Sequence, residues 1–318
     1  MNLHPSLNDV AVLFIFFTRV KQTQAVFEQI KRARPSKLFL YQDGARSGRE
    51  DDRKYIAECR KIVENIDWQC DVYRWYQSEN VGCDPSEYLS QKWMFSIVDK
   101  GIVLEDDDVP SQSFFPFCKE LLDKYEHDER INIICGMNNL GTIESPYSYI
   151  FSQYGSIWGW ATWKRNIDRW DPDYQWLNDE RTIQSLTYKY RHFDKWIKTC
   201  RQHLASGRAH YESILAAQAR LNNQLNIVPT KNLITNIGIA EETTHSVNDI
   251  SKLSRAVRKL LYMQQHEIEF PLKHPQYVIE DIAFKKRFEQ LCIPSGFVLL
   301  LRKLESKIYR IIPFLGRL

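Results

Sequence analysis

The stretch Gly101–Ser111, GIVLEDDDVPS, decides how the rest of the chain is interpreted. Ile102, Val103 and Leu104 form a short apolar run, which predicts a buried β-strand. Four carboxylates follow the strand directly: Glu105, Asp106, Asp107 and Asp108. Pro110 suits the first turn of a helix, so a helix is expected after the acids. In an open α/β sheet, the carboxylates would lie at the C-terminal edge, where such sheets bind ligands.

The chemistry of these four acids favours a metal–phosphate site. Adjacent anions repel one another unless a cation or hydrogen-bond donors offset their charge. Carboxylate oxygens suit Mg²⁺ or Mn²⁺, and these ions in turn suit phosphate oxygens. The alternative is an ordinary helix start, with Asp108 as the N-cap and acids favoured in the first turn. That alternative accounts for one or two acids but not for four behind an apolar strand.

Apolar runs alternate with amphipathic segments along the chain, which predicts a Rossmann-like, mostly parallel α/β sheet between helices. The expected strands are residues 10–17, 37–41, 69–76, 102–104, 131–135, 147–154, 225–228 and 233–237. The expected helices are residues 22–34, 50–66, 86–100, 114–125 and 210–224. At 318 residues, with 43% hydrophobic content, the chain is long enough for one large or two small domains.

Cysteine usage and hydropathy suggest a cytoplasmic protein. The seven cysteines are odd in number and lack zinc-site spacing, which indicates reduced thiols. The N-terminal residues MNLHPSLND lack the basic and apolar regions of a secretory signal. No run of 18 apolar residues is present, so no membrane span is expected.

Positive charge is concentrated near the C-terminus. Residues 252–318 hold 13 Lys or Arg against 6 Asp or Glu, whereas the net charge of the whole chain is only +3. Within Phe297–Leu318, apolar residues recur at three- and four-residue steps with basic residues on the flanks, and Pro313 should end the helix near Ile312. Such a helix is typical of peripheral contact with an anionic membrane. The alternatives are a helix docked on the rest of the chain and a dimer contact. No nucleic-acid motif accompanies the basic charge, so no nucleic-acid partner is expected.

A second motif, Gly155–Trp163, reads GSIWGWATW. Together with the Glu-Asp-Asp of residues 105–107, it resembles GT-A fold glycosyltransferases of a bacterial surface-polysaccharide group. A more distant resemblance is to the Golgi N-acetylglucosaminyltransferase that initiates complex N-glycans. The resemblance covers about Val10 to Ser246. It implies a catalytic domain at residues 1–250, in which residues 1–110 bind the nucleotide and residues 111–250 bind the acceptor. The tail lies outside the resemblance, and its charge and periodicity predict a helical basic extension at residues 251–318.

The resemblance implies roles for residues at the ends of the predicted strands. Asp43 and Arg19, with the adjacent Thr18, would contact the uracil end of a UDP-sugar. Asp106 would approach the ribose or sugar, and Glu105 would hold the sugar or water ligands. Asp107 would bind the metal ion, Mn²⁺ or Mg²⁺. The Asn-Val-Gly loop would line the nucleotide pocket through Asn80 and Gly82. The alternatives left open are a turn residue for Asp43, a surface cation for Arg19 and a plain turn for the loop.

Later positions match the family less closely. Glu212 stands where the family has an Asp as catalytic base, and a base there implies inversion at the anomeric carbon. Its alternative is a solvated acid at a helix start, and Asp179 and Glu180 are rival carboxylates. His245 would be a second metal ligand, or simply an exposed histidine. The acceptor platform would comprise Trp158, Gly159 and Trp160, with Trp163 assigned to the core.

The expected function is thus a metal-dependent, inverting glycosyltransferase. It would move a sugar, GlcNAc as first choice, from a UDP-sugar donor to a glycan acceptor. If that acceptor is lipid-linked, peripheral attachment at the inner face of the cytoplasmic membrane would bring the enzyme to it. One rival is a nucleotidyltransferase that makes nucleotide sugars, although the segment Thr18–Lys21 lacks the Gly-rich phosphate loop of that class. The other rival is a non-catalytic sugar-binding or assembly protein.

Overall fold

The computed structural model describes residues 3–238, 254, 258–293 and 296–311. Eight strands form one sheet in the order β3-β2-β1-β4-β8-β6-β9-β7, and two more strands pair as β10-β5. The strands are β1 (Asn8–Phe16), β2 (Pro35–Gln42), β3 (Asp71–Tyr76), β4 (Lys100–Glu105), β5 (Asp108–Pro110), β6 (Ile131–Cys135), β7 (Tyr149–Ser152), β8 (Trp160–Trp163), β9 (Leu225–Pro229) and β10 (Ile234–Asn236). β1 to β4 are mutually parallel, β8 runs antiparallel between β4 and β6, and β7 is an antiparallel edge.

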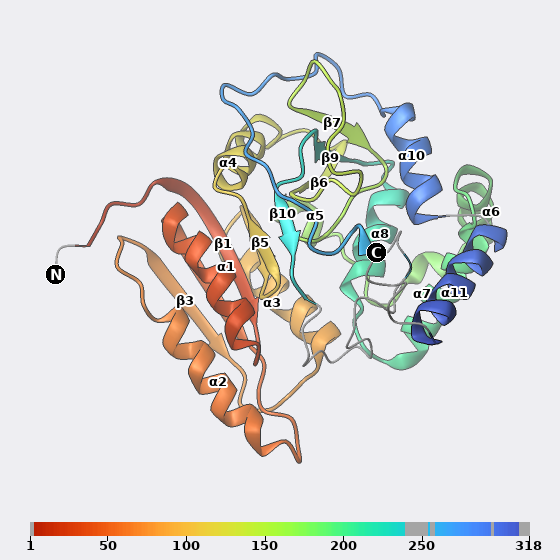
Figure 1. Cartoon of the computed structure of the whole chain (residues 1–318). Helices are drawn as coiled ribbons and strands as arrows, with labels where there is room; N and C mark the ends of the chain where they lie inside the picture. The colour runs from red at the N-terminus through yellow and green to blue at the C-terminus, as the bar shows by residue number, and fades with distance from the viewer. Residues whose placement is uncertain (1–2, 239–253, 255–257, 294–295, 312–318) are drawn as a thin grey trace.

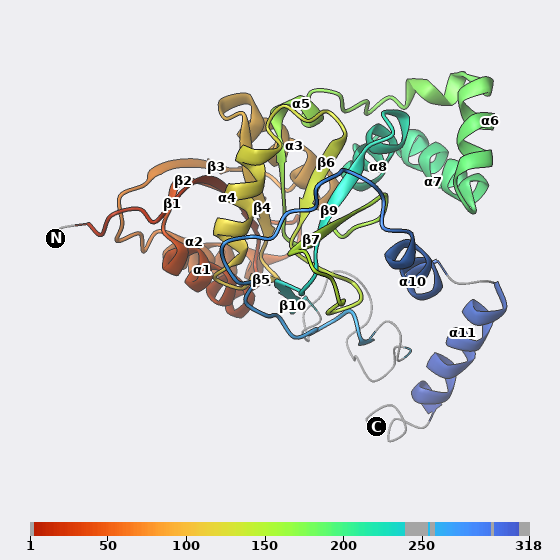
Figure 2. The ribbon, with the colours of Figure 1, turned by 90° about the horizontal axis from the view of Figure 1, so that it is seen from above.

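Helices cover both faces of the large sheet, as Figures 1 and 2 show. The helices are α1 (Val20–Ala33), α2 (Glu50–Val63), α3 (Cys83–Ile97), α4 (Phe114–Lys124), α5 (Lys164–Ile167), α6 (Glu180–Lys189), α7 (Phe193–Ser206), α8 (Tyr211–Leu221), α10 (Ile282–Cys292) and α11 (Gly296–Ile311), with a 3₁₀ turn at Gln175–Asn178. One apolar core lies under α1, α2 and α4, and the other under α3 and α5 to α8. The predicted α/β class, a mostly parallel sheet between helices, is confirmed.

The central strand β1 is buried on both faces of the sheet, which is why its sequence is a continuous apolar run. Val12 and Phe14 point into the first core, whereas Leu13 and Ile15 point into the second. A strand buried on both faces has no solvent side that would require polar residues. The run ends at Phe16, and α1 begins only four residues later, at Val20.

Two short strands correct the sequence interpretation. Pro110 does not open a helix, because Asp108–Pro110 forms β5, which pairs antiparallel with β10, and helix α4 begins at Phe114. Residues 160–163, expected only as a portion of a Gly-Trp segment, form β8 in the middle of the sheet. Both strands depend on partners that lie far away in the sequence, so their own three or four residues carry little strand signal.

Residues 263–281 contain no helix, and the helices α10 and α11 follow them. Residues 263–281 run along the body, where Ile268 and Leu272 join the first core and the His266 amide donates to the Asn232 carbonyl (N···O 2.7 Å). Residues 263–281 of the extension that was expected to be helical therefore contain no helix, and α10 begins at Ile282. The boundary expected near 250 lies outside the described residues. No described helix is both long and apolar enough to cross a membrane.

Helix α11 turns its apolar side chains outward, away from the rest of the described chain. Phe297, Leu300 and Leu304 are 70%, 54% and 47% exposed. The partly buried side of this helix includes Arg302, whose Nη1 donates to the Leu291 carbonyl (2.8 Å). The face predicted to be apolar is therefore not docked on the described body.

Candidate functional site

Two of the four consecutive acids meet Arg19 at the C-terminal edge of the sheet. Glu105 is the last residue of β4, paired in register with Ile15 of β1. Arg19 caps the start of α1 and directs its Nη1 to Asp106 Oδ1 (3.0 Å) and Asp107 Oδ2 (2.8 Å). Arg19 and the acids follow strand ends, as the sequence predicted. The structure makes these two strands neighbours and brings the side chains into contact, which the sequence did not predict.

Asp108 has a different environment, because its side chain bonds to two other segments of the chain, at Gly159 and Asn236. It is fully buried, its Oδ2 accepts from the Gly159 amide (2.8 Å) and its Oδ1 accepts from Asn236 Nδ2 (3.1 Å). Gly159 has φ of +59°, and a Cβ there would overlap the side chain of Ile234. The glycine of the WGWATW motif therefore supports the acidic loop, and glycine is required by both its backbone conformation and its close packing.

A second group of acids approaches from α3 and α8. Tyr211 Oη donates to Glu105 Oε1 (3.3 Å), which joins the first residue of α8 to the end of β4. Glu87 lies on α3, is 9% exposed and accepts from Cys83 Sγ (3.4 Å). Glu212 lies in the first turn of α8, and its charge acts on Glu87. Glu87 was not predicted from the sequence, because a lone acid on a predicted helix gives no signal until α8 packs against α3.

Electrostatics at this edge show an excess of negative charge. Burial, with the charges of Glu87 and Asp108 added, raises the pKa of Glu105 well above its ordinary value. Burial also raises the pKa of Asp106 to about 6, although Arg19 opposes the shift. Burial and the nearby Glu212 raise the pKa of Glu87 to about 8. In the described residues, Arg19 is the cation that contacts this group, and one positive charge does not balance it.

Asp43 holds the turn after β2 to the loop that contains Asn80. Its Oδ1 accepts from the amides of Gly44 (2.8 Å) and Val81 (2.9 Å), and its Oδ2 accepts from Asn80 Nδ2 (2.7 Å) and the Gly82 amide (3.0 Å). Asp43 is only 6% exposed. The residues predicted to bind the nucleotide, Asp43, Asn80 and Gly82, therefore form one structural unit. The Asp43 carboxylate holds the loop at residues 80–82, so the backbone of this loop is the part available to a ligand.

The other predicted residues lie as follows. Thr18 is half-buried in the turn before Arg19, and Trp158 is half-buried against the first core. Trp160 is 1% exposed within β8, so its ring fills the second core and is not a surface platform. Trp163 is in the core as predicted, with Nε1 donating to the Leu122 carbonyl (2.9 Å). His245 lies outside the described residues.

The rival carboxylates lie at the start of α6. Asp179 is its N-cap and accepts from the amides of Arg181 and Thr182, and Glu180 is exposed in its first turn. Both therefore have the ordinary role of acids at a helix start.

The donor set at the sheet edge fits a divalent cation in its chemistry. Asp107 offers carboxylate oxygens, its side chain is 14% exposed, and surplus negative charge surrounds it. Both oxygens of Asp107 accept hydrogen bonds, from Arg19 and Asn236, so a metal ion would replace these donors. Asp108 fits less well because it is 0% exposed. Among the residues that the structure describes, no group of three or more His, Cys, Asp or Glu is placed to hold a metal ion. Any metal would thus take most of its remaining ligands from a bound diphosphate and water.

Comparison with known proteins adds a fold-level similarity only. No family model matches the chain, and no curated protein matches it. Among solved structures, it is similar to a UDP-glucose pyrophosphorylase in complex with UDP-glucose, with a TM-score of 0.37 and 9% sequence identity. The match covers 71% of this chain and 92% of that one. A similarity this distant assigns no activity.

Proposed function

We propose that this protein is a metal-dependent, inverting glycosyltransferase that moves a sugar from a UDP-sugar to a glycan acceptor. The observation that carries the proposal is the meeting of Arg19, Asp106 and Asp107 at the C-terminal edge of β1 and β4. A mostly parallel α/β sheet binds its ligands at that edge. The acid pair and the arginine together suit a nucleotide diphosphate accompanied by a cation.

The described residues divide into a donor side and an acceptor side. Arg19 would bind a phosphate, and the backbone of the loop at residues 80–82 would contact the nucleoside. Asp107 would hold Mn²⁺ or Mg²⁺, which supplies charge neutralisation to the leaving diphosphate when bound. Glu105 would hold a sugar hydroxyl, supported by Tyr211 Oη. GlcNAc remains the first choice of sugar, on the family resemblance alone.

Glu212 is proposed as the general base. It lies one residue after Tyr211, which contacts Glu105, and it is close enough to Glu87 to raise the pKa of that acid. Glu212 is an exposed residue in the first turn of α8, where we expect the acceptor hydroxyl to approach. Transfer of the hydroxyl proton to Glu212 in a single displacement inverts the anomeric carbon.

The two rival classes of protein would differ from a glycosyltransferase in what they release. A nucleotidyltransferase would release diphosphate from UTP and a sugar 1-phosphate, whereas a sugar-binding protein would release nothing. The short turn at residues 17–19 counts against the former, because β1 passes into α1 without a glycine-rich phosphate loop.

The deciding experiment is a donor screen with a matched pair of variants. UDP release from UDP-sugars with Mn²⁺ and UDP binding by calorimetry are measured for the native chain, Asp107→Ala and Asp194→Ala. Asp194 is exposed in the first turn of α7 and serves as the control. We expect Asp107→Ala to lose metal-dependent UDP binding while Asp194→Ala retains it. Unchanged binding in Asp107→Ala contradicts the assignment, and diphosphate release from UTP and glucose 1-phosphate favours the nucleotidyltransferase.

We also propose that α11 attaches the protein to an anionic membrane surface. The support is the outward apolar face of α11, together with its basic residues Arg302, Lys303 and Lys307. Such a helix lies in the interface plane, with its apolar face in the acyl boundary and its cations near lipid phosphates. This attachment would bring the site close to a lipid-linked glycan.

A further inference from the structure

A cavity of about 290 Å³ runs along α8 away from the candidate base. One stripe of the helix forms its wall, from Glu212 through Leu215 and Ala216 to Arg220. Residues 153–157, which precede the WGWATW motif, line it as well. Eight residues of helix separate Glu212 from Arg220, a rise of about 12 Å. The cavity therefore connects the position of the acceptor hydroxyl to a cation more than one sugar ring away.

Arg220 is a largely buried cation in this wall. Its guanidinium lies over the rings of Trp196 (4.6 Å to the centroid) and Tyr190 (5.5 Å), and its Nη1 donates to the Ala216 carbonyl (2.9 Å). In the described residues it forms no ion pair with an Asp or Glu. Burial lowers the pKa of Arg220, which is the electrostatic penalty of a cation without a nearby anion. A ligand that carries a negative charge would remove this penalty.

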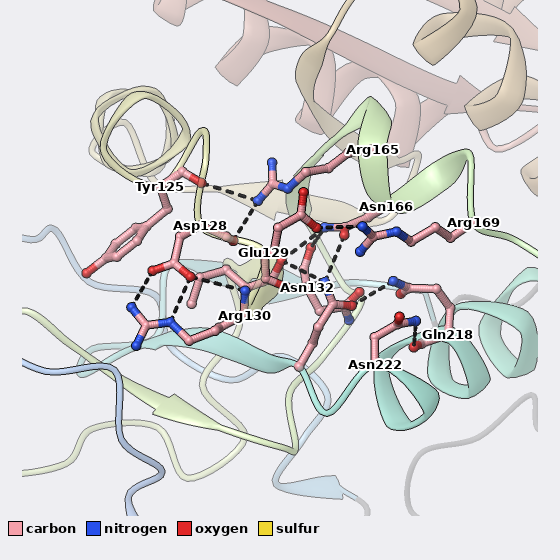
Figure 3. Close-up of polar contacts among 12 residues, drawn as sticks. Tyr125, Asp128, Glu129, Arg130, Asn132, Arg165, Asn166, Arg169, Gln218 and Asn222 are labelled. Carbon is pink, nitrogen blue, oxygen red and sulfur yellow. Dashed lines mark hydrogen bonds and ion pairs between the residues drawn. The ribbon is translucent and has the colours of Figure 1, made fainter. Parts of the chain in front are cut away.

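Two amide oxygens in the lining also lack partners. Asn132 Oδ1 and Asn139 Oδ1 are buried without a hydrogen-bond donor in the described portion of the chain. The Asn132 side chain is oriented by its Nδ2, which donates to Asn226 Oδ1 (2.9 Å). The backbone carbonyl of Asn132 accepts from Asn166 Nδ2 (2.6 Å), within the polar network in Figure 3. Buried polar atoms are nearly always hydrogen-bonded, so the lining is built to receive donors such as hydroxyl groups.

We propose that this cavity binds the acceptor, and that the acceptor is an acidic glycan. The sugar next to the one that receives the new residue carries a carboxylate, which pairs with Arg220. Its hydroxyls donate to Asn132 and Asn139, and the receiving hydroxyl lies at Glu212. The role of the cavity as the acceptor site rests on the proposed function. The binding of an acidic sugar rests only on the residues that line the cavity.

The test compares a charged and a neutral probe of equal size. Binding of methyl β-glucuronide and methyl β-glucoside is measured by saturation-transfer NMR on the full chain. We expect the glucuronide to bind at least about tenfold more tightly, because charge-assisted hydrogen bonds are about twice as strong as neutral ones. Arg220→Gln should remove the preference, and Arg220→Lys should retain some of it. Arg201→Gln, which removes an exposed charge on α7, should leave the preference unchanged.

Each result supports or overturns the inference. Equal binding of the two glycosides, or an unchanged preference in Arg220→Gln, overturns it. Inorganic phosphate is the third probe, and if it displaces the glucuronide at equal concentration, the cavity is a general anion site and the acidic-glycan proposal fails. Circular dichroism and UDP binding confirm that the variants are folded. If the native chain binds the glucuronide but transfers no sugar, the proposed function is contradicted and the assignment of the cavity as an anionic-sugar site remains.

Discussion

At Arg19 one guanidinium faces two carboxylates, Asp106 and Asp107, that come 87 and 88 residues later in the chain. The sequence placed both groups at strand ends, which share an edge in a parallel sheet, but it did not predict their contact. The role of Asp43 was harder to foresee. Its four hydrogen bonds to residues 44 and 80–82 depend on how two loops pack, and residue type alone did not reveal them. Predictions of residue position thus held where a strand fixes that position and fell short where two loops meet.

Replacement of Glu212 by Gln tests the general base. The change keeps the size of the side chain and removes its basicity, so turnover should fall by about 10²–10⁴-fold. The affinity for UDP should remain the same, because the base contacts the acceptor. Steady-state kinetics with the best donor and calorimetry with UDP measure the two effects.

Glu180→Gln is the control, since Glu180 is an exposed acid in the first turn of α6. Near-native turnover in Glu212→Gln, combined with a large loss in Glu180→Gln, would transfer the role of base to the latter residue.

Among the elements, long apolar strands were predicted well and short inserted strands were not. β1 and β6 were found because both faces are buried and their residues are almost all apolar. β8 was missed because Trp160–Trp163 owes its conformation to β4 and β6 on either side of it. β5 was mistaken for a helix start because Pro110 suits both, and only pairing with β10 decides between them. Tertiary pairing therefore overrode local preference in both cases.

The beginning of α2 provides a prediction for pH dependence. Asp52 accepts from Arg46 Nε (2.8 Å), Nη2 (2.7 Å) and backbone amide (3.0 Å), and it is 3% exposed. The hydrogen bond from Arg46 holds the pKa of Asp52 below its ordinary value. Because the folded-state pKa is lowered, the stabilisation is present above the unfolded pKa of about 3.9 and is lost as pH falls through the folded value.

Asp52→Asn should therefore lower the free energy of unfolding by about 1–2 kcal/mol at neutral pH, the range for a hydrogen bond to a charged group with one partner partly exposed. Urea unfolding of the native chain, Asp52→Asn and the exposed neighbour Asp51→Asn measures it. The difference between native and Asp52→Asn should shrink below about pH 4. A constant difference at every pH would show that the charge on Asp52 does not contribute.

In the whole molecule, two cores share one sheet and α11 projects away from both (Figure 2). The position of α11 was predictable from its periodicity, since the expected end near Ile312 agrees with Gly296–Ile311. The direction of its apolar face was not predictable, because a helix docked on the body and a helix exposed to lipid have the same sequence pattern. The exposed Leu300 and Leu304 favour the second case.

Liposome flotation tests this assignment on the full chain. Leu300→Gln with Leu304→Gln should abolish flotation with anionic vesicles, because it removes the centre of the apolar face. Each cation near an anionic leaflet contributes about 1 kcal/mol, so native flotation should weaken as salt rises. Tyr277→Ser removes an exposed apolar side chain outside α11 and should change nothing. Equal flotation of the native chain and the double variant would contradict the membrane role.

The contacts of the candidate site have a consequence for how the chain folds. Tyr211 and Glu105 are 106 residues apart in the sequence, and Asn236 and Asp107 are 129 apart. Contacts of such separation form late, because the entropy of closing long loops must first be offset by other interactions. β4 also pairs with β8, and β6 and β7 lie between these two strands in the sequence. We therefore expect the acidic edge to be among the last regions to become ordered, after the strands from β1 to β10 have paired.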